Sequence, residues 1–490
     1  MGPEKNPVRG QRPQKRDEEI NKEATIPGES VQSILSNEGI PPSIVQFGGQ
    51  TGMNLARALA RANYPILGTS AESIDLAEDR ARFQNLLERL GIPQPPGASA
   101  RTTDEALTIA HHIGYPVLLR PSYVIGGRAM EIIQNEEDLR YHLKEISQIP
   151  SESTILIDKY LEGAEVEVDA VSDGENVLIP GIMEHIEQAG IHSGDSIAVY
   201  PPISLSTEEI DTLIDYTRRI SQALNIKGLI NVQYVITRNS NESTAYVIEA
   251  NPRASRTVPF IAKATGVPMV MLATRAMLGV SFTELGYKDG LWPSQKLVAV
   301  KVPVFSMSKL EGVDSYLGPE MKSTGEVMGI DYTFEASLFK ALLAAGISLP
   351  RQGNILLSFS DRTKPDSQPL IRQLVQSGYK IFATEGTAAM IKDMQFKVET
   401  VLKSIEEGHP NAVDIINDGV VDAVINTPEG KQVATLKDGF YIRRAAIGKR
   451  IPCFTSLNTA RAVIETMLMR EQEFTVQSVQ EYRTSQSDLA

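Results

Sequence analysis

The chain has 490 residues, of which 42% are hydrophobic and 22% charged, and its net charge at pH 7 is −13. This length suffices for about three globular domains. The lack of any run of about 18 apolar residues argues against a membrane span. The negative charge argues against a nucleic-acid partner. The single cysteine, Cys453, excludes an internal disulfide and a cysteine-rich metal site, and its apolar setting indicates a buried strand thiol. We expect a cytoplasmic protein that acts on small molecules.

The N-terminal part combines a polar leader with a short α/β unit. Residues 1–30 are polar and mixed in charge, which predicts a disordered leader. They lack the apolar core of a secretory signal, and their acidic residues argue against a transit peptide. Apolar runs at 44–47 and 64–68 predict strands, and 54–62 between them predicts a helix. This βαβ pattern indicates a parallel sheet, and an amphipathic helix is expected over 77–90.

The rest of the chain divides into an α+β unit, a larger lobe, a connector and a terminal α/β domain. In the first unit we expect helices at 103–113 and 136–147, and strands at 117–120, 129–133 and 154–157. Strands near 166–171 and 177–183 open a lobe that runs to about 285, and 296–352 forms a mixed connector with a helix at 336–345. Beyond 353, strands at 354–359, 378–384, 422–426 and 439–442 alternate with helices, which is typical of a doubly wound domain.

The most informative motif is a predicted hairpin between 228 and 251 with a polar loop at 237–243. Side chains two apart on a strand share a face, so Asn231 and Gln233 point one way, as do Glu249 and Asn251. If the strands pair antiparallel, these oxygen ligands converge, as Mg²⁺ requires. Arginines at 253 and 256 follow at once, in place to hold a phosphoryl-accepting anion. We interpret the pattern as an ATP–Mg site; the alternative is that Asn-Pro at 251–252 is only a turn signal.

Long stretches of the chain resemble the C-terminal half of the carbamoyl phosphate synthetase large subunit, over residues 43–480. The motifs that carry this resemblance are Val45-Gln-Phe-Gly-Gly-Gln-Thr51, Ala77-Glu-Asp-Arg80, Arg120-Pro-Ser-Tyr-Val-Ile-Gly-Gly-Arg-Ala-Met-Glu131, Met183-Glu-His-Ile-Glu-Gln-Ala-Gly-Ile-His-Ser-Gly-Asp-Ser196 and Gly318-Pro-Glu-Met-Lys-Ser-Thr-Gly-Glu-Val327.

The resemblance implies an α/β and α+β architecture: an ATP-grasp fold preceded by a truncated pre-ATP-grasp βαβ subdomain and followed by a doubly wound methylglyoxal-synthase-like domain. The divisions that follow are a disordered leader at 1–30, a partial pre-ATP-grasp subdomain at 31–95, an ATP-grasp synthetase domain at 96–285, a connector or helical region at 286–352, and an allosteric domain at 353–490. The glycine-rich strand with which the family's synthetase unit opens is not found in residues 1–40, which is why we expect a truncated subdomain.

In that family this half is a ligase component that phosphorylates carbamate with ATP, giving carbamoyl phosphate and ADP. The reaction belongs to glutamine-dependent carbamoyl phosphate synthesis for pyrimidine and arginine biosynthesis. The resemblance therefore implies ATP and Mg²⁺ or Mn²⁺ as cofactors. Carbamate or bicarbonate and ammonia are the implied substrates, and a nucleotide the implied effector. The implied protein partners are a glutaminase small subunit and a separate N-terminal synthetase half of the large subunit.

The resemblance also implies roles for individual residues. The metal ligands are Gln233, Glu249 and Asn251, and the catalytic residues are Arg120, Asn231, Arg253 and Arg256. The ATP-binding set comprises phosphate clamps, a glycine loop, adenine and ribose contacts, a loop beside the nucleotide, and two of the metal ligands: Arg80, Arg120, Gly126, Gly127, Lys159, Leu161, Glu165, Gly190, Ile191, His192, Ser193, Gln233 and Glu249. The implied effector site comprises Lys364, Thr384, Thr387, Lys403 and Asn426.

Some of these residues also fit a purely structural role. Arg80 and Arg120 taken alone fit surface ion pairs, and the Gly126-Gly127 pair or the Thr384–Thr387 segment fits a plain turn. Two other functions remain open: a non-catalytic regulatory or assembly subunit, and a biotin-carboxylase-like ATP-grasp enzyme. Family members activated by ornithine carry an acid where Val302 stands, so we do not expect ornithine activation.

Overall fold

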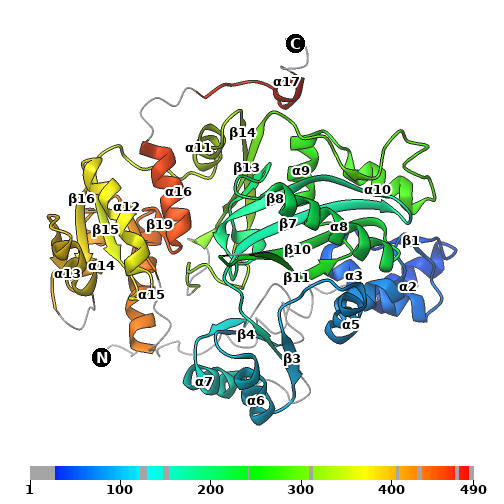
Figure 1. The fold of residues 1–490 in the computed structure, drawn as a ribbon, viewed down its shortest axis with the longest axis horizontal. Coiled ribbons are helices and arrows are strands. Elements are labelled where there is room, and N and C mark those ends of the chain that lie inside the picture. Colours follow the sequence, from blue (N-terminus) through cyan, green and yellow to red (C-terminus); the bar gives the residue numbers. More distant parts are fainter. Residues whose placement is uncertain are drawn as a thin grey trace, which may run out of the picture.

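The computed structural model describes residues 28–121, 130–146, 154–240, 242–307, 313–403, 408–427, 433–468 and 474–484. Within these ranges the strands form four sheets, of two, four, eight and five strands (Figure 1). No described helix is by itself long and apolar enough to cross a membrane, although the bent pair α9 (Thr257–Thr265) and α10 (Met269–Met277) together meet that length and composition.

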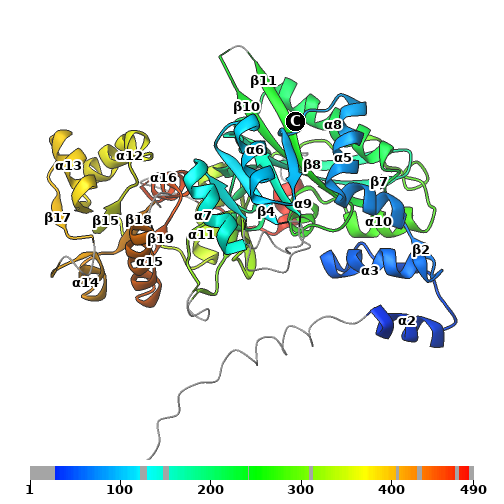
Figure 2. The same cartoon turned by 90° about the horizontal axis from the view of Figure 1, so that it is seen from below.

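The N-terminal unit carries the smallest sheet. Strands β1 (Ser43–Ile44) and β2 (Ile66–Leu67) pair in parallel, as the βαβ pattern predicted. Helices α2 (Gly28–Asn37) and α3 (Gly49–Arg61) lie at the end of the molecule opposite the C-terminal α/β domain (Figure 2). Strand β1 is shorter than the predicted 44–47, because the main-chain oxygen of Gln46 accepts from Ala254 N at 2.9 Å instead of pairing with β2.

Two further helices lead from this unit toward the site. They are α4 (Ala71–Glu78) and α5 (Arg80–Leu90). The carboxylate of Asp79 caps α5 by accepting from Arg82 N, and Gly91 closes the helix in the left-handed conformation at φ 62°. These end signals fix where α5 begins, and therefore where its first residue, Arg80, lies.

The four-stranded sheet is antiparallel in the order β3-β6-β4-β5. Its strands are β3 (Gly97–Ala100), β4 (Val117–Pro121), β5 (Glu131–Ile133) and β6 (Ile155–Lys159). Helices α6 (Thr103–Ile113) and α7 (Glu136–Ile146) pack their apolar residues on one face of it. The helices and strands predicted for this unit are confirmed within the described ranges.

The eight-stranded sheet runs in the order β11-β10-β7-β8-β9-β13-β14, with β12 paired to β8. Its strands are β7 (Ala164–Asp173), β8 (Val177–Gln188), β9 (Ala198–Tyr200), β10 (Lys227–Arg238), β11 (Ser243–Asn251), β12 (Gly290–Leu291), β13 (Val298–Val304) and β14 (Gly325–Asp331). The segment expected to be a mixed connector thus supplies β13 and β14, because β13 pairs with both β9 and β14. The predicted helix there is present as α11 (Phe334–Ala344).

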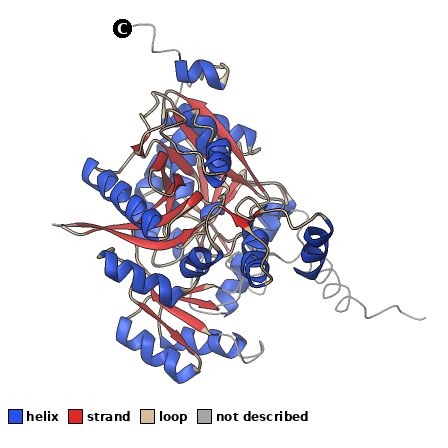
Figure 3. Cartoon of the chain, turned by 90° about the vertical axis from the view of Figure 1, so that its right-hand side faces the viewer, coloured by secondary structure: helices blue, strands red, loops and turns tan. Residues whose placement is uncertain are grey.

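Helices cover both faces of this sheet (Figure 3). Helices α5 and α8 (Thr207–Ala223) pack on one face against residues such as Val166 and Val168. Helices α9 and α10 pack on the other against Val171 and Leu178. Because both faces are buried, polar residues within the strands are the exception, and those that occur mark the site.

The C-terminal domain is a parallel sheet in the order β17-β16-β15-β18-β19, formed by β15 (Asn354–Ser358), β16 (Lys380–Thr384), β17 (Glu399–Val401), β18 (Ala423–Asn426) and β19 (Cys453–Phe454). Its helices are α12 (Lys364–Gln376), α13 (Glu385–Asp393), α14 (Ala412–Asn417), α15 (Val433–Gly448) and α16 (Leu457–Leu468), and a final helix, α17 (Val479–Thr484), contacts α9 and β14.

The predicted strand at 439–442 is wrong, since those residues lie in α15. Phe440 to Ile442 is a short run of aromatic and β-branched residues of the kind that strands favour. Ile442 and Ala446, one helical turn apart, are both buried in the same apolar cluster as Val424 of β18. Tertiary packing therefore selects the helix over the local strand preference.

The C-terminal domain and the eight-stranded sheet share one apolar cluster. Val300 and Val302 of β13 and Leu338 of α11 pack in it together with Ile355 and Leu357 of β15. The interface between the two domains is therefore a continuation of both cores.

Candidate functional site

The hairpin strands β10 and β11 pair antiparallel, as expected, with a β-bulge between Gln233 and Tyr234. Asn231 lies opposite Asn251, and Gln233 lies opposite Glu249. The amide nitrogen of Asn251 donates to Glu249 Oε1 at 2.8 Å. The hairpin thus gathers a carboxylate and three amides at one end of two adjacent strands.

The amide of Gln233 contacts the loop that follows β8, two strands away in the sheet. Its Nε2 donates to Ser193 Oγ at 3.1 Å. With that nitrogen engaged, the side-chain oxygen of Gln233 is the atom that can coordinate a cation. Oxygen donors of this kind, next to the Glu249 carboxylate, form the hard ligand set that Mg²⁺ prefers.

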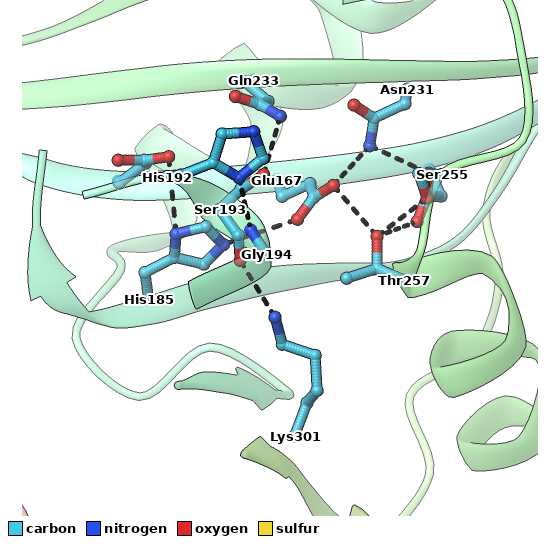
Figure 4. Close-up of polar contacts among 12 residues, drawn as sticks. Glu167, His185, His192, Ser193, Gly194, Asn231, Gln233, Ser255, Thr257 and Lys301 are labelled. Atoms are coloured by element: carbon cyan, nitrogen blue, oxygen red, sulfur yellow. Dashed lines mark hydrogen bonds and ion pairs between the residues drawn. The ribbon is translucent and has the colours of Figure 1, made fainter. Parts of the chain in front are cut away.

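Two buried acids of β7 hold the amide of Asn231 (Figure 4). Its Nδ2 donates to Glu167 Oε1 at 2.6 Å and to Asp169 Oδ1 at 2.9 Å. Burial and the neighbouring Glu167 charge raise the pKa of Asp169. Burial opposes ionisation of Glu167 as well, but the imidazole of His185, 3.5 Å away, and the charge of Lys301 lower its pKa. The pair therefore shares its charge unevenly, with Glu167 the more acidic member.

His185 of β8 lies between two of these acids. Its Nδ1 is 3.5 Å from Glu165 Oε1 and its Nε2 is 3.5 Å from Glu167 Oε2 (Figure 4). Burial disfavours a charged imidazole, yet the two carboxylates raise the pKa of His185 to about 9. At neutral pH the ring is therefore a cation, which offsets part of the negative charge around the hairpin.

The loop at 190–195 lies beside the hairpin and is tied down on several sides. Gly190 has φ 107°, and a Cβ there would come within 2.9 Å of Ile132 and Tyr160. His192 Nδ1 accepts from Gly194 N at 3.0 Å, capping the 3₁₀ helix Ser193–Asp195, and burial lowers the pKa of His192. Ile191, which was also predicted to lie beside the nucleotide, stands between Gly190 and His192.

Lys301 of β13 and the segment around Lys322 also bind this loop. The ammonium group of Lys301, which is 1% exposed, donates to Ser193 O at 2.9 Å. Asp195 accepts from Lys322 N at 2.8 Å and from Ser323 N at 2.9 Å. The segment around 313–324 therefore forms one wall of the site.

Two of the predicted nucleotide contacts, Arg80 and Arg120, meet at Asp158 beside the four-stranded sheet, and Lys159 is bound separately. Arg80 Nη2 is 2.6 Å from Asp158 Oδ1, and Arg120 Nη2 is 3.7 Å from Asp158 Oδ2. Lys159 Nζ donates to the main-chain oxygens of Gly114 and Tyr115 at 2.9 and 3.0 Å. The two arginines share one partly buried carboxylate, an arrangement more ordered than the isolated surface ion pairs considered from the sequence.

The remaining predicted residues fall into three groups. Arg253 and Arg256 follow β11: Arg253 Nη2 is 3.4 Å from Asn251 Oδ1, and Arg256 Nη1 donates to Ser323 Oγ at 3.1 Å. Leu161 lies between β6 and β7, and Glu165 is the second residue of β7. Gly126 and Gly127 lie outside the described residues.

The five predicted effector residues come together at the carboxyl edge of the C-terminal sheet. Thr384 and Asn426 end the strands β16 and β18, on either side of β15, and Lys403 follows β17. Thr387 Oγ1 accepts from Phe359 N at 2.9 Å, and Lys364 Nζ is 2.5 Å from Asp361 Oδ1. In open α/β sheets this edge is where ligands bind.

Several residues of the site escaped the sequence analysis. Asp158 and Asp169 are the main ones, together with the buried Arg443 and its partly exposed partner Asp314, whose Nε and Oδ1 are 2.6 Å apart. A signal for Asp169 existed in the sequence: acids at 165, 167 and 169 alternate with apolar residues, which places three acids on one face of a buried strand.

Three protein-family models match parts of the chain. They are the carbamoyl phosphate synthase pre-ATP-grasp domain over residues 17–76, the ATP-binding domain of the carbamoyl-phosphate synthase L chain over 79–285, and an MGS-like domain over 367–455. The carbamoyl phosphate synthase large chain of Thermomicrobium roseum is 53% identical over 471 residues, covering 95% of this chain and 43% of that protein. The chain thus spans less than half the length of this curated relative.

Solved structures share the fold at low identity. The biotin carboxylase domain dimer of the Hydrogenobacter thermophilus 2-oxoglutarate carboxylase, in complex with MgADP, ADP and bicarbonate, is 20% identical with a TM-score of 0.51, covering 64% of this chain and 76% of that one. Biotin carboxylase from Campylobacter jejuni is 18% identical with a TM-score of 0.47, over 59% and 71% of the two chains. With the three domain matches, the first of these confirms the expected architecture of a pre-ATP-grasp unit, an ATP-grasp unit and an MGS-like domain.

Proposed function

Because the chain belongs to the carbamoyl phosphate synthase large-chain family and corresponds to the C-terminal half of such a chain, we propose that it phosphorylates carbamate with ATP to give carbamoyl phosphate and ADP. The observation that carries this proposal is the register of β10 on β11, which gathers Gln233, Glu249 and Asn251 beside Asn231. The relatives share this chain's sequence over less than half of their length, so the activity is argued from the site itself.

The donor set of the hairpin fits a magnesium ion held with the phosphates of ATP. A carboxylate and amide oxygens are hard ligands, and the ion would neutralise phosphate charge when bound. Gln233, Glu249 and Asn251 would hold it, and Mn²⁺ has similar ligand preferences. The neighbour bound to MgADP supports the choice of nucleotide and metal.

The cationic side chains surround the hairpin on two sides. Arg80, at the start of α5, and Arg120, on the four-stranded sheet, would bind the nucleotide phosphates. Lys159 and Leu161 would line the adenine pocket next to Glu165, the ribose contact. Arg253 and Arg256 would hold carbamate for attack. A carbamate oxygen forms a bond to the γ-phosphorus while the bond from that phosphorus to the β–γ bridging oxygen breaks, so positioning and charge stabilisation dominate.

The wider setting of this reaction is also part of the proposal. Carbamate would come from a separate synthetase half that uses bicarbonate and ammonia, with ammonia from a glutaminase subunit, in a cytoplasmic pathway toward pyrimidines and arginine. The edge formed by Thr384, Asn426 and Lys364 would bind a nucleotide effector by its phosphate, because threonine hydroxyls, a lysine and helix N-termini suit that anion. The MGS-like match supports this assignment.

The test is the reverse half-reaction on the purified chain, measured as ATP formed from Mg-ADP and carbamoyl phosphate. Glu249→Gln should lower the rate by at least about 100-fold, because it removes a charged metal ligand. Glu242→Gln, the same substitution in the exposed loop of the same hairpin, is the matched control and should retain the rate.

The outcomes separate the proposals. ATP formation that depends on Glu249 supports carbamate phosphorylation by this chain. ATP formation only after a synthetase half and a glutaminase are added would assign the activity to the assembly. No ATP in either setting would overturn the proposal in favour of a non-catalytic regulatory subunit, and ATP formation unaffected by Glu249→Gln would overturn the metal assignment.

A further inference from the structure

The arginine loop, residues 252–256 between β11 and α9, is anchored to a buried acid. Ser255 Oγ donates to Asp169 Oδ1 at 2.7 Å, and Thr257 Oγ1 donates to Asp169 Oδ2 at 2.6 Å. Ser255 and Thr257 flank Arg256 in the chain. Asp169 therefore fixes the backbone on both sides of Arg256, although it does not contact that side chain.

The same carboxylate holds the metal-binding hairpin. Asp169 Oδ1 accepts from Asn231 Nδ2 at 2.9 Å, and Asp169 and Asn231 lie directly opposite each other on β7 and β10. Because Glu167 Oε1 accepts from the same nitrogen at 2.6 Å, both amide hydrogens of Asn231 are engaged and its oxygen faces the other way (Figure 4). Asp169 thus joins the hairpin to both ends of the Ser255–Thr257 segment, and Glu167 Oε1, 3.0 Å from Thr257 Oγ1, adds a second contact to Thr257 alone.

Packing alone does not explain why Asp169 is buried. Asp169 is 0% exposed, and burying a carboxylate is unfavourable unless hydrogen bonds compensate for its lost hydration. Within the described part of the chain, the side-chain hydrogen bonds that it accepts come from Asn231, Ser255 and Thr257. All three belong to segments that carry proposed site residues, so the compensation is tied to the arrangement of the site.

We propose that Asp169 is a positioning residue that sets the arginine loop against the metal-binding hairpin, so that Arg253 and Arg256 meet the anion beside the metal ligands. This inference rests on the proposed function. It has a selective consequence, because none of the three partners of Asp169 belongs to the group of Arg80, Arg120 and Lys159 that would bind the nucleotide. Loss of Asp169 should impair the anion side of the site and leave the nucleotide side largely intact.

The experiment uses two variants that break the anchor in different ways. Asp169→Asn keeps the shape of the side chain but replaces an accepting oxygen with an NH₂ group, which cannot accept from the three donors around it. Thr257→Val removes one hydroxyl at constant volume. Each should lower kcat/KM for carbamoyl phosphate by about 10- to 100-fold in the ATP-forming reaction. The Kd of Mg-ADP, measured by calorimetry, should change less than about twofold. The side chains proposed to bind the nucleotide keep all their hydrogen bonds in both variants.

Two comparisons separate positioning from general stability. Thr257→Ser keeps the hydroxyl and should restore most of kcat/KM. Thr217→Val removes another buried threonine hydroxyl, which is 2.7 Å from Tyr234 OH on the opposite face of the same sheet. It should lower the melting temperature without changing KM for carbamoyl phosphate.

The inference is overturned if Asp169→Asn and Thr257→Val leave kcat/KM unchanged, or if they weaken Mg-ADP and carbamoyl phosphate equally. If Asp169→Asn fails to fold, Thr257→Val decides alone. If the wild-type chain forms no ATP, the proposed function fails, and the inference is then judged from calorimetric binding of carbamoyl phosphate. Binding that is lost in the two variants supports it, and binding that persists in them, or is missing from the wild-type chain, overturns it.

Discussion

Arg443 offers a test of how the C-terminal MGS-like domain is joined to the candidate site. Its side chain is 2% exposed, with Nε at 2.6 Å and Nη2 at 2.5 Å from the carboxylate oxygens of Asp314, and Nη1 donates to Asn426 Oδ1 at 2.6 Å. Asn426 belongs to the predicted effector site, and Asp314 begins the wall segment that also supplies Ser323, the partner of Arg256. We consider Arg443→Met, which keeps the apolar stem and removes the charge.

The size of the effect follows from the burial of the two partners. Removing one member of a buried ion pair costs about 3–5 kcal/mol, because the other charge is left uncompensated. The side chain of Asp314 is 32% exposed, so water takes over part of its solvation. We therefore expect a loss of about 2–3 kcal/mol in the local stability of this contact, which corresponds to about 30- to 150-fold faster amide exchange where exchange requires its opening.

Hydrogen exchange followed by mass spectrometry measures this locally. Peptides from 313–324 and 438–448 should exchange faster in Arg443→Met, while peptides from β3 to β6 should not change. Arg372→Met, the same substitution at an exposed position of α12, is the control. Adding Asp314→Asn to Arg443→Met should restore part of the protection, because the stranded carboxylate is gone. Unchanged exchange in the single variant, or a double variant that exchanges faster still, would refute the reasoning.

Two further predictions concern titrating groups. Burial raises the pKa of Glu131 from 4.5 to about 6, against a smaller effect of Lys322, so its folded-state pKa exceeds its unfolded one and the ionised carboxylate destabilises the fold by about 2 kcal/mol above pH 7. Glu131→Gln should therefore melt higher than the wild type at pH 7.5 and equally at pH 4.5; a difference independent of pH would contradict this. Burial also raises the pKa of the Cys453 thiol to about 12, so an aromatic disulfide reagent at pH 8 should modify it only after unfolding in guanidinium, and rapid modification of the native chain would show the thiol to be accessible.

The hairpin could be predicted from the sequence because the residues that determine it are close together in the chain. The polar loop sets the pairing, and period-two alternation then places Asn231 with Gln233 and Glu249 with Asn251 on shared faces. In the structure Asn231 faces Asn251 and Gln233 faces Glu249, but the pairing includes a β-bulge between Gln233 and Tyr234 that the alternation did not indicate. The parallel sheets were likewise foreseeable, since strands alternate with helices along the chain.

Long-range contacts could not be predicted in the same way. Thr257 reaches Asp169 across 88 positions of the chain, and Arg443 reaches Asp314 across 129. Nothing in the local pattern of either residue selects its partner, because a buried acid and a buried arginine are each compatible with many neighbours. The helix at 439–442 was missed for a related reason, since its burial against β18 overrides a local preference for strand.

The apolar cluster shared by the two domains limits how they can be recombined. Val300, Val302 and Leu338 pack on the synthetase side, and Ile355 and Leu357 pack on the regulatory side, within one cluster. A chimaera cut near residue 352 would leave half of that cluster facing water on each fragment, a surface that favours aggregation. To exchange the C-terminal domain, the graft would have to begin before β13 and carry α11 with it, and its residues would have to fit Ile197 and Val199 at β9, which belong to the same cluster.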